Sequence, residues 1–160
     1  MYNNQFKFVS IYRSLNLEEN GQKELICNIQ KLKPDTNEDI MVLDFNLLDV
    51  NWNSMTVNCA KNTENSNLIL QREYMDLFTQ KGLSPCLSNG TTTRRRMVGA
   101  NLQTSQLDQV LTSNPSIVLD VNTVAPLGIS DHLGIVVNPR TISASLNPCK
   151  RIGQNSLVRI

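Results

Sequence analysis

The chain has 160 residues, and 40% of them are hydrophobic, so it has room for one domain with a packed core. The formal net charge is only +1, yet residues 1–76 carry seven basic and eleven acidic side chains, whereas residues 77–160 carry eight and three. A basic second half suits binding to a polyanion, although solvated surface charge is the commoner cause of such a bias. The sequence has no run of 18 apolar residues and no secretory leader pattern, so we expect an intracellular protein, nuclear or cytoplasmic, without a membrane partner.

Cysteine and histidine are too sparse and scattered to predict a zinc site. The four cysteines lie far apart with no C-x-x-C pair, and His132 is the only histidine. The cysteines are Cys27, Cys59, Cys86 and Cys149. We therefore expect reduced thiols in the core or on the surface.

Hydrophobic periodicity predicts a strand, a helix and a second strand in the first 43 residues. Residues 6–12 alternate with a period of two, which places Phe8, Ser10 and Tyr12 on one face of a strand. Apolar residues at helical spacing predict an amphipathic helix over residues 22–33, ended by a proline. The apolar run at residues 40–43 is too short for a helix and predicts a buried strand.

The rest of the chain alternates in the same way. Residues 49–68 are rich in asparagine and predict an irregular loop, and residues 71–80 predict a helix capped by Lys81-Gly82. Further strands are expected at residues 106–111, 117–124 and 132–137. This pattern favours an α/β or α+β sheet protein, and the segment from residue 139 to residue 160 is expected to be a basic linker or tail.

Two short segments carry chemistry. Asp44-Phe45-Asn46 closes an apolar run, and Ser130-Asp131-His132 opens another. Phosphodiester hydrolysis on a divalent metal needs oxygen ligands, an amide to hold phosphate, and an imidazole. Taken alone, each segment is more simply a turn beside a strand, because Asp and Asn are favoured in turns. Their joint occurrence favours the functional interpretation.

These segments resemble the endonuclease/exonuclease/phosphatase (DNase I-like) superfamily, in the version carried by non-LTR (LINE-type) retrotransposons of the Jockey and CR1 kind. The resemblance rests on residues 40–52 and is supported, in order and spacing, by Ile11-Tyr12-Arg13, Thr93-Arg94, residues 107–115 and residues 125–132. It implies that residues 1–138 are a partial domain, namely the C-terminal portion of a four-layer α/β sandwich. It also implies two partners, DNA and the reverse transcriptase domain of the same element.

The resemblance implies a role for each matching residue. Asp44 resembles the carboxylate that activates water, Asn46 the amide that holds the scissile phosphate, and His132 the imidazole that contacts phosphate or moves a proton. Asp108 resembles the carboxylate that orients this imidazole, and Tyr12 a phenol aimed at the phosphate. Asp131 resembles a ligand of Mg²⁺ or Mn²⁺. The resemblance also implies that Arg13, Arg94 and Arg95 contact the nucleic-acid backbone.

The chain also departs from the family pattern. It starts at the Tyr12 strand, so the family's preceding half, with its metal-binding Glu, is expected to be absent and the chain alone to be weak or inactive. Leu43 stands where the family has Gly, and its side chain is expected to crowd the site. Three functions therefore compete: a DNA endonuclease that nicks the target for retrotransposition, a non-enzymatic remnant of a mobile element, and another phosphatase or nuclease of the superfamily.

Overall fold

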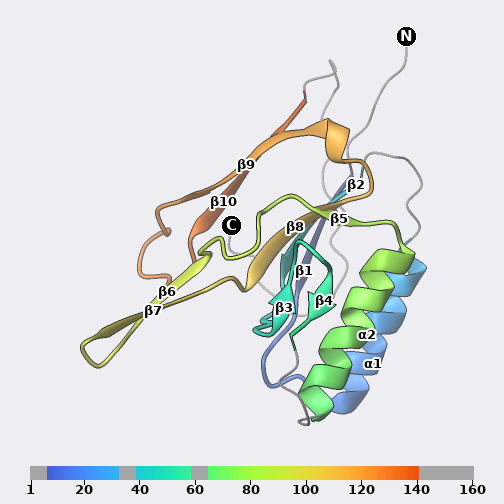
Figure 1. Cartoon of the computed structure of the whole chain (residues 1–160), viewed down its shortest axis with the longest axis horizontal. Coiled ribbons are helices and arrows are strands. Elements are labelled where there is room, and N and C mark those ends of the chain that lie inside the picture. The colour runs from blue at the N-terminus through green and yellow to red at the C-terminus, as the bar shows by residue number, and fades with distance from the viewer. Residues whose placement is uncertain (1–6, 33–38, 59–64, 141–160) are drawn as a thin grey trace.

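The computed structural model of the chain describes residues 7–32, 39–58 and 65–140. The two α-helices are α1 (Glu19–Lys31) and α2 (Ser66–Gln80), and a 3-10 turn, η1, spans Pro115–Ile117. The strands are β1 (Lys7–Tyr12), β2 (Asp39–Asp44), β3 (Val50–Asn51), β4 (Thr56–Val57), β5 (Ser84–Pro85), β6 (Arg94–Val98), β7 (Asn101–Ser105), β8 (Asp108–Thr112), β9 (Val118–Val124) and β10 (Gly134–Pro139). Figure 1 shows three successive layers: the two helices, a central sheet, and the β9–β10 ribbon.

The central sheet has the strand order β1-β2-β8-β5. β1 and β2 run parallel, and β2 and β8 run antiparallel. The alternation predicted for β1 is confirmed, because Val9 and Ile11 pack into the core while Phe8, Ser10 and Tyr12 are exposed. The sheet therefore has one face that is fully covered by helices and another that is covered in part.

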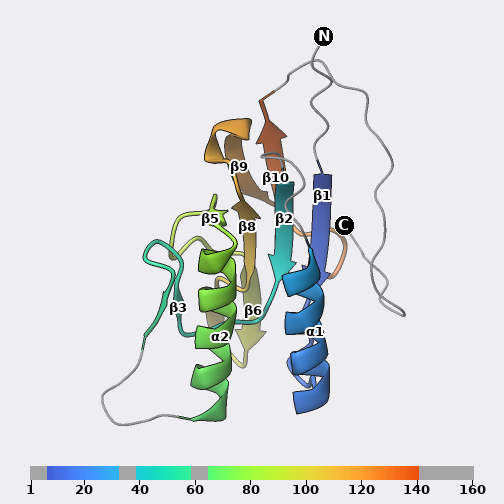
Figure 2. The same cartoon turned by 90° about the vertical axis from the view of Figure 1, so that its right-hand side faces the viewer.

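Both helices pack side by side on one face of the sheet (Figure 2). α2 begins five residues earlier than predicted, because the side chain of Asn65 caps it by accepting a hydrogen bond from the backbone N–H of Leu68. The main core lies between the helices and the sheet, and it contains the aromatic cluster Phe45, Tyr74 and Phe78. Neither of these helices is long and apolar enough to cross a membrane.

A smaller core joins the opposite face of the sheet to β9 and β10. Ile40, Val110 and Ile117 are fully or almost fully buried there, with Val121 and Ile135 packed against them. β9 and β10 pair antiparallel with each other. Because β9 and β10 pack on this face, the loop that connects them lies at the end of the central sheet.

Two hairpins were not predicted from the sequence. β3 and β4 form a two-residue ladder inside the segment predicted as loop, and β6 and β7 form a longer ladder that projects from the molecule in Figure 1. The expectation of an irregular loop over residues 49–68 is therefore wrong where β3, β4 and the start of α2 lie, while residues 59–64 fall outside the described part of the chain. Val50 and Val57 of the β3–β4 hairpin pack in the main core, whereas β6 and β7 are mostly exposed and are defined by their mutual hydrogen bonds.

Candidate active site

Three polar side chains stand in a row across the central sheet, at the end of β1, the end of β2 and the start of β8. The strand registers pair Tyr12 with Asp44 and Asp44 with Asp108. Paired residues of neighbouring strands point to the same face. That face is the one toward β9 and β10, because Val42 and Val110, two residues away along their strands, pack in the core on that side.

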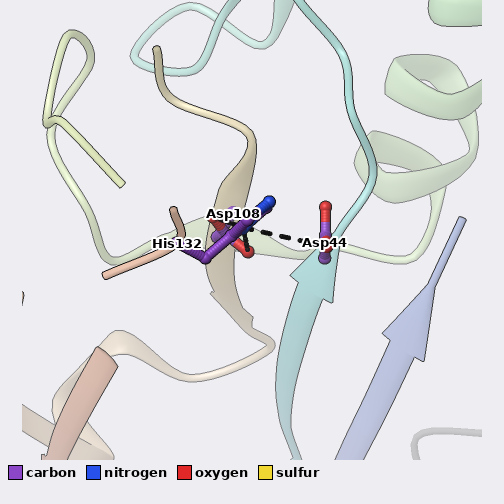
Figure 3. Close-up of side chains that lie close together, drawn as sticks. All are labelled: Asp44, Asp108 and His132. Atoms are coloured by element: carbon purple, nitrogen blue, oxygen red, sulfur yellow. Dashed lines mark hydrogen bonds and ion pairs between the residues drawn. The ribbon is translucent and has the colours of Figure 1, made fainter. Parts of the chain in front are cut away.

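His132 meets this row from the loop between β9 and β10 (Figure 3). Its Nδ1 lies 3.0 Å from Oδ2 of Asp108 and 3.9 Å from Oδ2 of Asp44. The expected hydrogen bond between Asp108 and His132 is therefore present. Ligand atoms of the three residues all lie within 4.8 Å of one another, a spacing that can hold a metal ion.

Thr93 holds Asp108 and the His132 loop together. The Thr93 side chain is fully buried, and its Oγ1 accepts hydrogen bonds from the backbone N–H groups of Leu107 and Asp108 at 2.9 and 3.0 Å. The backbone carbonyl of Thr93 accepts another from Leu133, at 2.7 Å. The sequence pointed to Thr93 only through the family resemblance, because its function here depends on contacts between distant segments.

The charges of the cluster interact strongly. Burial, assisted by the negative charge of Asp108, raises the pKa of Asp44 to about 6. The hydrogen bond that His132 donates to the Asp108 carboxylate raises the pKa of His132 above its usual range, against the opposing effect of burial. Oδ1 of Asp44 is buried and has no hydrogen-bond partner among the described residues. The two carboxylates of the cluster thus carry negative charge that is only partly balanced by hydrogen bonds and positive charges of the described residues.

Asn46 lies just beyond the end of β2, beside this row. Its backbone has a φ of 52°, in the left-handed region, where Asn is one of the few tolerated residues. Its Nδ2 donates a hydrogen bond of 2.9 Å to the backbone carbonyl of Arg13. Tyr12, at the other end of the row, is 57% exposed. Both residues are therefore near the cluster, and Tyr12 faces solvent.

Arg13 is not available as a contact to the DNA backbone, contrary to expectation. Its side chain is only 4% exposed, and Nε and Nη1 donate hydrogen bonds to Oε1 of Gln22 and to the carbonyl of Phe45. The guanidinium also lies over the ring of Tyr74, 5.9 Å from its centre. Arg13 continues the alternation of β1, because it lies on the helix-facing side like Val9 and Ile11, so the pattern that exposes Tyr12 also buries Arg13.

Asp131 and Arg94 bind each other. Nε of Arg94 donates to Oδ2 of Asp131 at 2.7 Å, and this hydrogen bond lowers the pKa of the Asp131 carboxyl. Asp131, predicted as the metal ligand, is therefore outside the Asp44–Asp108–His132 cluster. The backbone N–H of Arg95 donates to the carbonyl of Asp131, while its side chain is exposed.

Leu43 does not crowd the site. Its side chain is 1% exposed and packs in the core between the sheet and the helices, on the face opposite to Asp44. The expectation that a Leu at this position disturbs close backbone packing is therefore wrong for this chain. Leu43 is part of the packing that supports β2.

Solved structures with a similar fold are nucleases. One is the endonuclease domain of TRAS1, a telomere-specific non-LTR retrotransposon, with a TM-score of 0.60 and 18% identity over 85% of this chain and 58% of that chain. Another is the 3′-5′ exonuclease NExo from Neisseria meningitidis, with a TM-score of 0.52 and 16% identity over 76% of this chain and 52% of that chain. At these identities the similarity shows the fold, and the chain spans just over half the length of either structure.

Comparison of sequences gives a more specific result. The chain matches no curated protein. Residues 6–136, which are most of the chain, match the model of the family described as endonuclease-reverse transcriptase. This agrees with the resemblance found in the motifs around Asp44 and His132 and with the α/β fold shared with the TRAS1 endonuclease domain. The chain therefore belongs to the endonuclease-reverse transcriptase family, and its fold is that of the DNase I-like nucleases.

Proposed function

We propose that this chain is part of a DNA endonuclease that hydrolyses a phosphodiester bond at the Asp44–Asp108–His132 cluster. The observation that carries the proposal is the hydrogen bond between His132 and Asp108, made beside a second, partly buried carboxylate, Asp44. A histidine oriented by a carboxylate can stabilise or move charge on a phosphate, and a nearby carboxylate can activate water. The family name and the nuclease folds of both similar structures support this reaction class.

In this proposal Asp44 is the general base and His132 faces the phosphate. A carboxylate with a pKa of about 6 is largely ionised at neutral pH and accepts a proton more readily than an ordinary Asp. Since Nδ1 of His132 is held by Asp108, Nε2 is the atom left to donate to a phosphate oxygen or to the leaving oxygen. Tyr12 and Asn46, which both lie on the β1 side of Asp44, supply further polar contacts to the phosphate.

The cluster fits Mg²⁺ or Mn²⁺. Two carboxylates converge there, and the buried Oδ1 of Asp44 has no hydrogen-bond partner within the described part of the chain, so a cation at this position would satisfy an otherwise costly group. Asp44 and Asp108 are the acids we propose as ligands, because Asp131 is paired with Arg94. When bound, the metal would polarise a phosphate oxygen.

The proposed substrate is double-stranded DNA that is nicked for retrotransposition. Arg95 is the proposed contact to the DNA backbone, because it is exposed on β6, whereas Arg94 is partly neutralised by Asp131. The reverse transcriptase named in the family description is the proposed partner, and it would extend the nicked end. Because the chain spans 58% of the TRAS1 domain, we propose that it nicks weakly unless it is joined to the rest of an endonuclease domain.

Conversion of supercoiled plasmid to open circles tests this function. The chain is assayed as it stands and joined to the uncovered part of the TRAS1 domain, with Mg²⁺, with Mn²⁺ and with EDTA. We expect metal-dependent nicking, mainly by the joined form, that His132→Ala reduces by about 10²-fold. Equal nicking with and without His132, or none by a folded joined form, would favour the non-enzymatic remnant.

A further inference from the structure

Asn46 is held in an unusual conformation by one neighbouring residue. Its φ of 52° is reached directly after the extended strand β2, so the backbone turns sharply at this position. A left-handed residue at a functional site persists only when the surrounding contacts hold it there. Three hydrogen bonds provide these contacts, and two of them involve Arg13, whose guanidinium donates one and whose backbone carbonyl accepts the other.

The first contacts fix the peptide group that leads into Asn46. Nη1 of Arg13 donates to the carbonyl oxygen of Phe45 at 2.9 Å, and the N–H of Phe45 donates to the carbonyl of Leu107 at 3.1 Å. Phe45 is itself fully buried among aromatic rings. The plane of the peptide bond between Phe45 and Asn46 is thereby held from the protein interior.

The next contact fixes the side chain of Asn46. Its Nδ2 donates to the backbone carbonyl of Arg13 at 2.9 Å. A carbonyl oxygen can only accept, so the nitrogen of the amide must face Arg13, and the oxygen and the second N–H face away. One residue thus holds both the backbone and the side-chain orientation of the proposed phosphate ligand.

Arg13 is in turn fixed by polar residues of both helices. Nε donates to Oε1 of Gln22 in α1, which also accepts a hydrogen bond from the hydroxyl of Tyr74 in α2, at 2.9 Å. Gln22 and Tyr74 are 6% and 0% exposed. Within the described residues no carboxylate pairs with Arg13, so its buried donors are used on neutral acceptors. Burying a guanidinium that has no carboxylate partner costs folding free energy, which points to a role beyond stability.

We propose that Arg13 is a positioning residue, which holds Asn46 in the orientation required to contact the scissile phosphate and does not touch DNA itself. This inference rests on the proposed function of the site. A planar guanidinium can reach Phe45 and Gln22 at once, whereas a lysine ammonium at the end of a flexible stem cannot hold both in the same geometry. A displacement of Asn46 by about 1 Å is enough to lower a catalytic rate by about 10²-fold.

Two variants at Arg13 and one matched control test this inference. Arg13→Met removes all the guanidinium contacts, and Arg13→Lys keeps the charge and at most one of them. Tyr74→Phe removes a different buried hydrogen bond of the same network and leaves the bond from Arg13 to Phe45 in place. Thermal unfolding and circular dichroism identify the variants that remain folded.

The direct measurement is ¹⁵N relaxation of the Asn46 backbone amide in the whole chain, without metal or DNA, because this amide belongs to the peptide group whose carbonyl is held by Nη1 of Arg13. We expect a rigid amide, with an order parameter near about 0.85, in the native chain and in Tyr74→Phe, and a value below about 0.6 in Arg13→Met. The order parameter in Arg13→Lys is expected to lie between these values. If Arg13→Met fails to fold, Arg13→Lys tests whether Arg13 positions Asn46. An Asn46 amide that stays rigid in folded Arg13 variants, or that loosens equally in Tyr74→Phe, would overturn the inference.

Nicking kinetics provide the second measurement, in the form of the protein that nicks DNA. We expect both Arg13 variants to lower kcat, Arg13→Met by about 10²-fold, with KM changed less than about twofold, because the contact acts through Asn46. A rise in KM alone would overturn the inference in favour of a DNA contact. If even the native protein does not nick, the proposed function fails, and the amide measurement still decides whether Arg13 positions Asn46.

Discussion

At the scale of single residues, the Asp44 carboxylate that we propose as the base also lowers the stability of the fold when it is ionised. Its pKa is about 6 in the folded chain and near 3.8 in the unfolded chain, so between these pH values the folded state binds more protons than the unfolded state. The free energy of unfolding must therefore fall as the pH rises from about 4 to about 6. Near neutral pH the folded chain holds an ionised carboxylate that its environment disfavours.

Replacing the Asp44 carboxylate should raise stability and remove activity at the same time. In EDTA at pH 7, we expect Asp44→Asn to raise the free energy of unfolding by about 1–3 kcal/mol, to flatten its pH dependence between pH 4 and 6, and to abolish nicking. Urea unfolding at pH 4 and pH 7 measures the effect. Asp76→Asn, at an exposed position on α2, is the matched control and should change neither. A less stable Asp44→Asn at pH 7 would contradict the pKa argument.

His132 offers a second prediction at this scale. It is the only histidine, so its ring resonances can be followed by NMR without assignment. Because the hydrogen bond to the Asp108 carboxylate is the main cause of its raised pKa, Asp108→Asn should lower that pKa, and nicking should fall by about 10²-fold. Asp131→Asn should lower the pKa less, since Asp131 contributes the smallest effect. An unchanged pKa in Asp108→Asn would mean that the Asp108 contact does not control the imidazole.

At the scale of elements, β2 must be held firmly, because it ends at the proposed base. Leu43 anchors it on the helix side of the sheet. We expect Leu43→Ala to lower the free energy of unfolding by about 2–5 kcal/mol, and Leu43→Gly to lower it by about 0.5–1 kcal/mol more. Urea unfolding gives these values, with Leu102→Ala on the exposed part of β7 as a control that should change little. Higher stability or activity in Leu43→Gly would instead support the expectation that the Leu43 side chain crowds the site.

The β6–β7 hairpin supports a prediction about DNA affinity. It projects on the opposite side of the molecule from α1, and it carries the exposed Arg95 near the site (Figure 1). Arg95→Ala should weaken DNA binding modestly for all sequences and reduce the slope of log affinity against log salt by about 1. Fluorescence anisotropy at several salt concentrations measures the slope. Lys31→Ala, on α1, should leave it unchanged, and an equal effect of both variants would refute a specific contact.

At the scale of the whole molecule, the face of the central sheet opposite the helices is covered only in part. β1 is the terminal strand of this sheet. Phe8 and Tyr12 on the partly covered face are 37% and 57% exposed. Apolar side chains that are exposed on a terminal strand favour association with other chains.

A charge on this strand should therefore reduce self-association. Ser10 is exposed on the same face, between Phe8 and Tyr12. We expect the native chain to form larger species as its concentration rises, and Ser10→Lys to reduce this with little change in melting temperature. Light scattering coupled to gel filtration measures the mass, and Lys23→Ala on α1 serves as a surface control. Identical association of native chain and Ser10→Lys would show that β1 is not the contact.

The fold class, the order of the main elements and the convergence of Asp44, Asp108 and His132 could be predicted from the sequence. Alternation in β1 separated its faces, and the motifs around Asp44 and His132 identified the family, because both signals are local in the chain. The boundaries of α2 and the hairpins β3–β4 and β6–β7 were missed, since α2 begins at a capping bond, β3 and β4 have two residues each, and β6 and β7 are mostly exposed.

Which polar groups meet depends on contacts between segments that lie far apart in the chain. Strand register placed Tyr12, Asp44 and Asp108 in one row, and the β9–β10 loop brought His132 to it. Residues far apart in the chain also paired Asp131 with Arg94 and buried Arg13 behind Asn46. Motif spacing cannot predict such outcomes, because an arginine or aspartate follows the same local pattern whether it faces DNA, a metal or the protein interior. The partners that surround each charge in space determine its role.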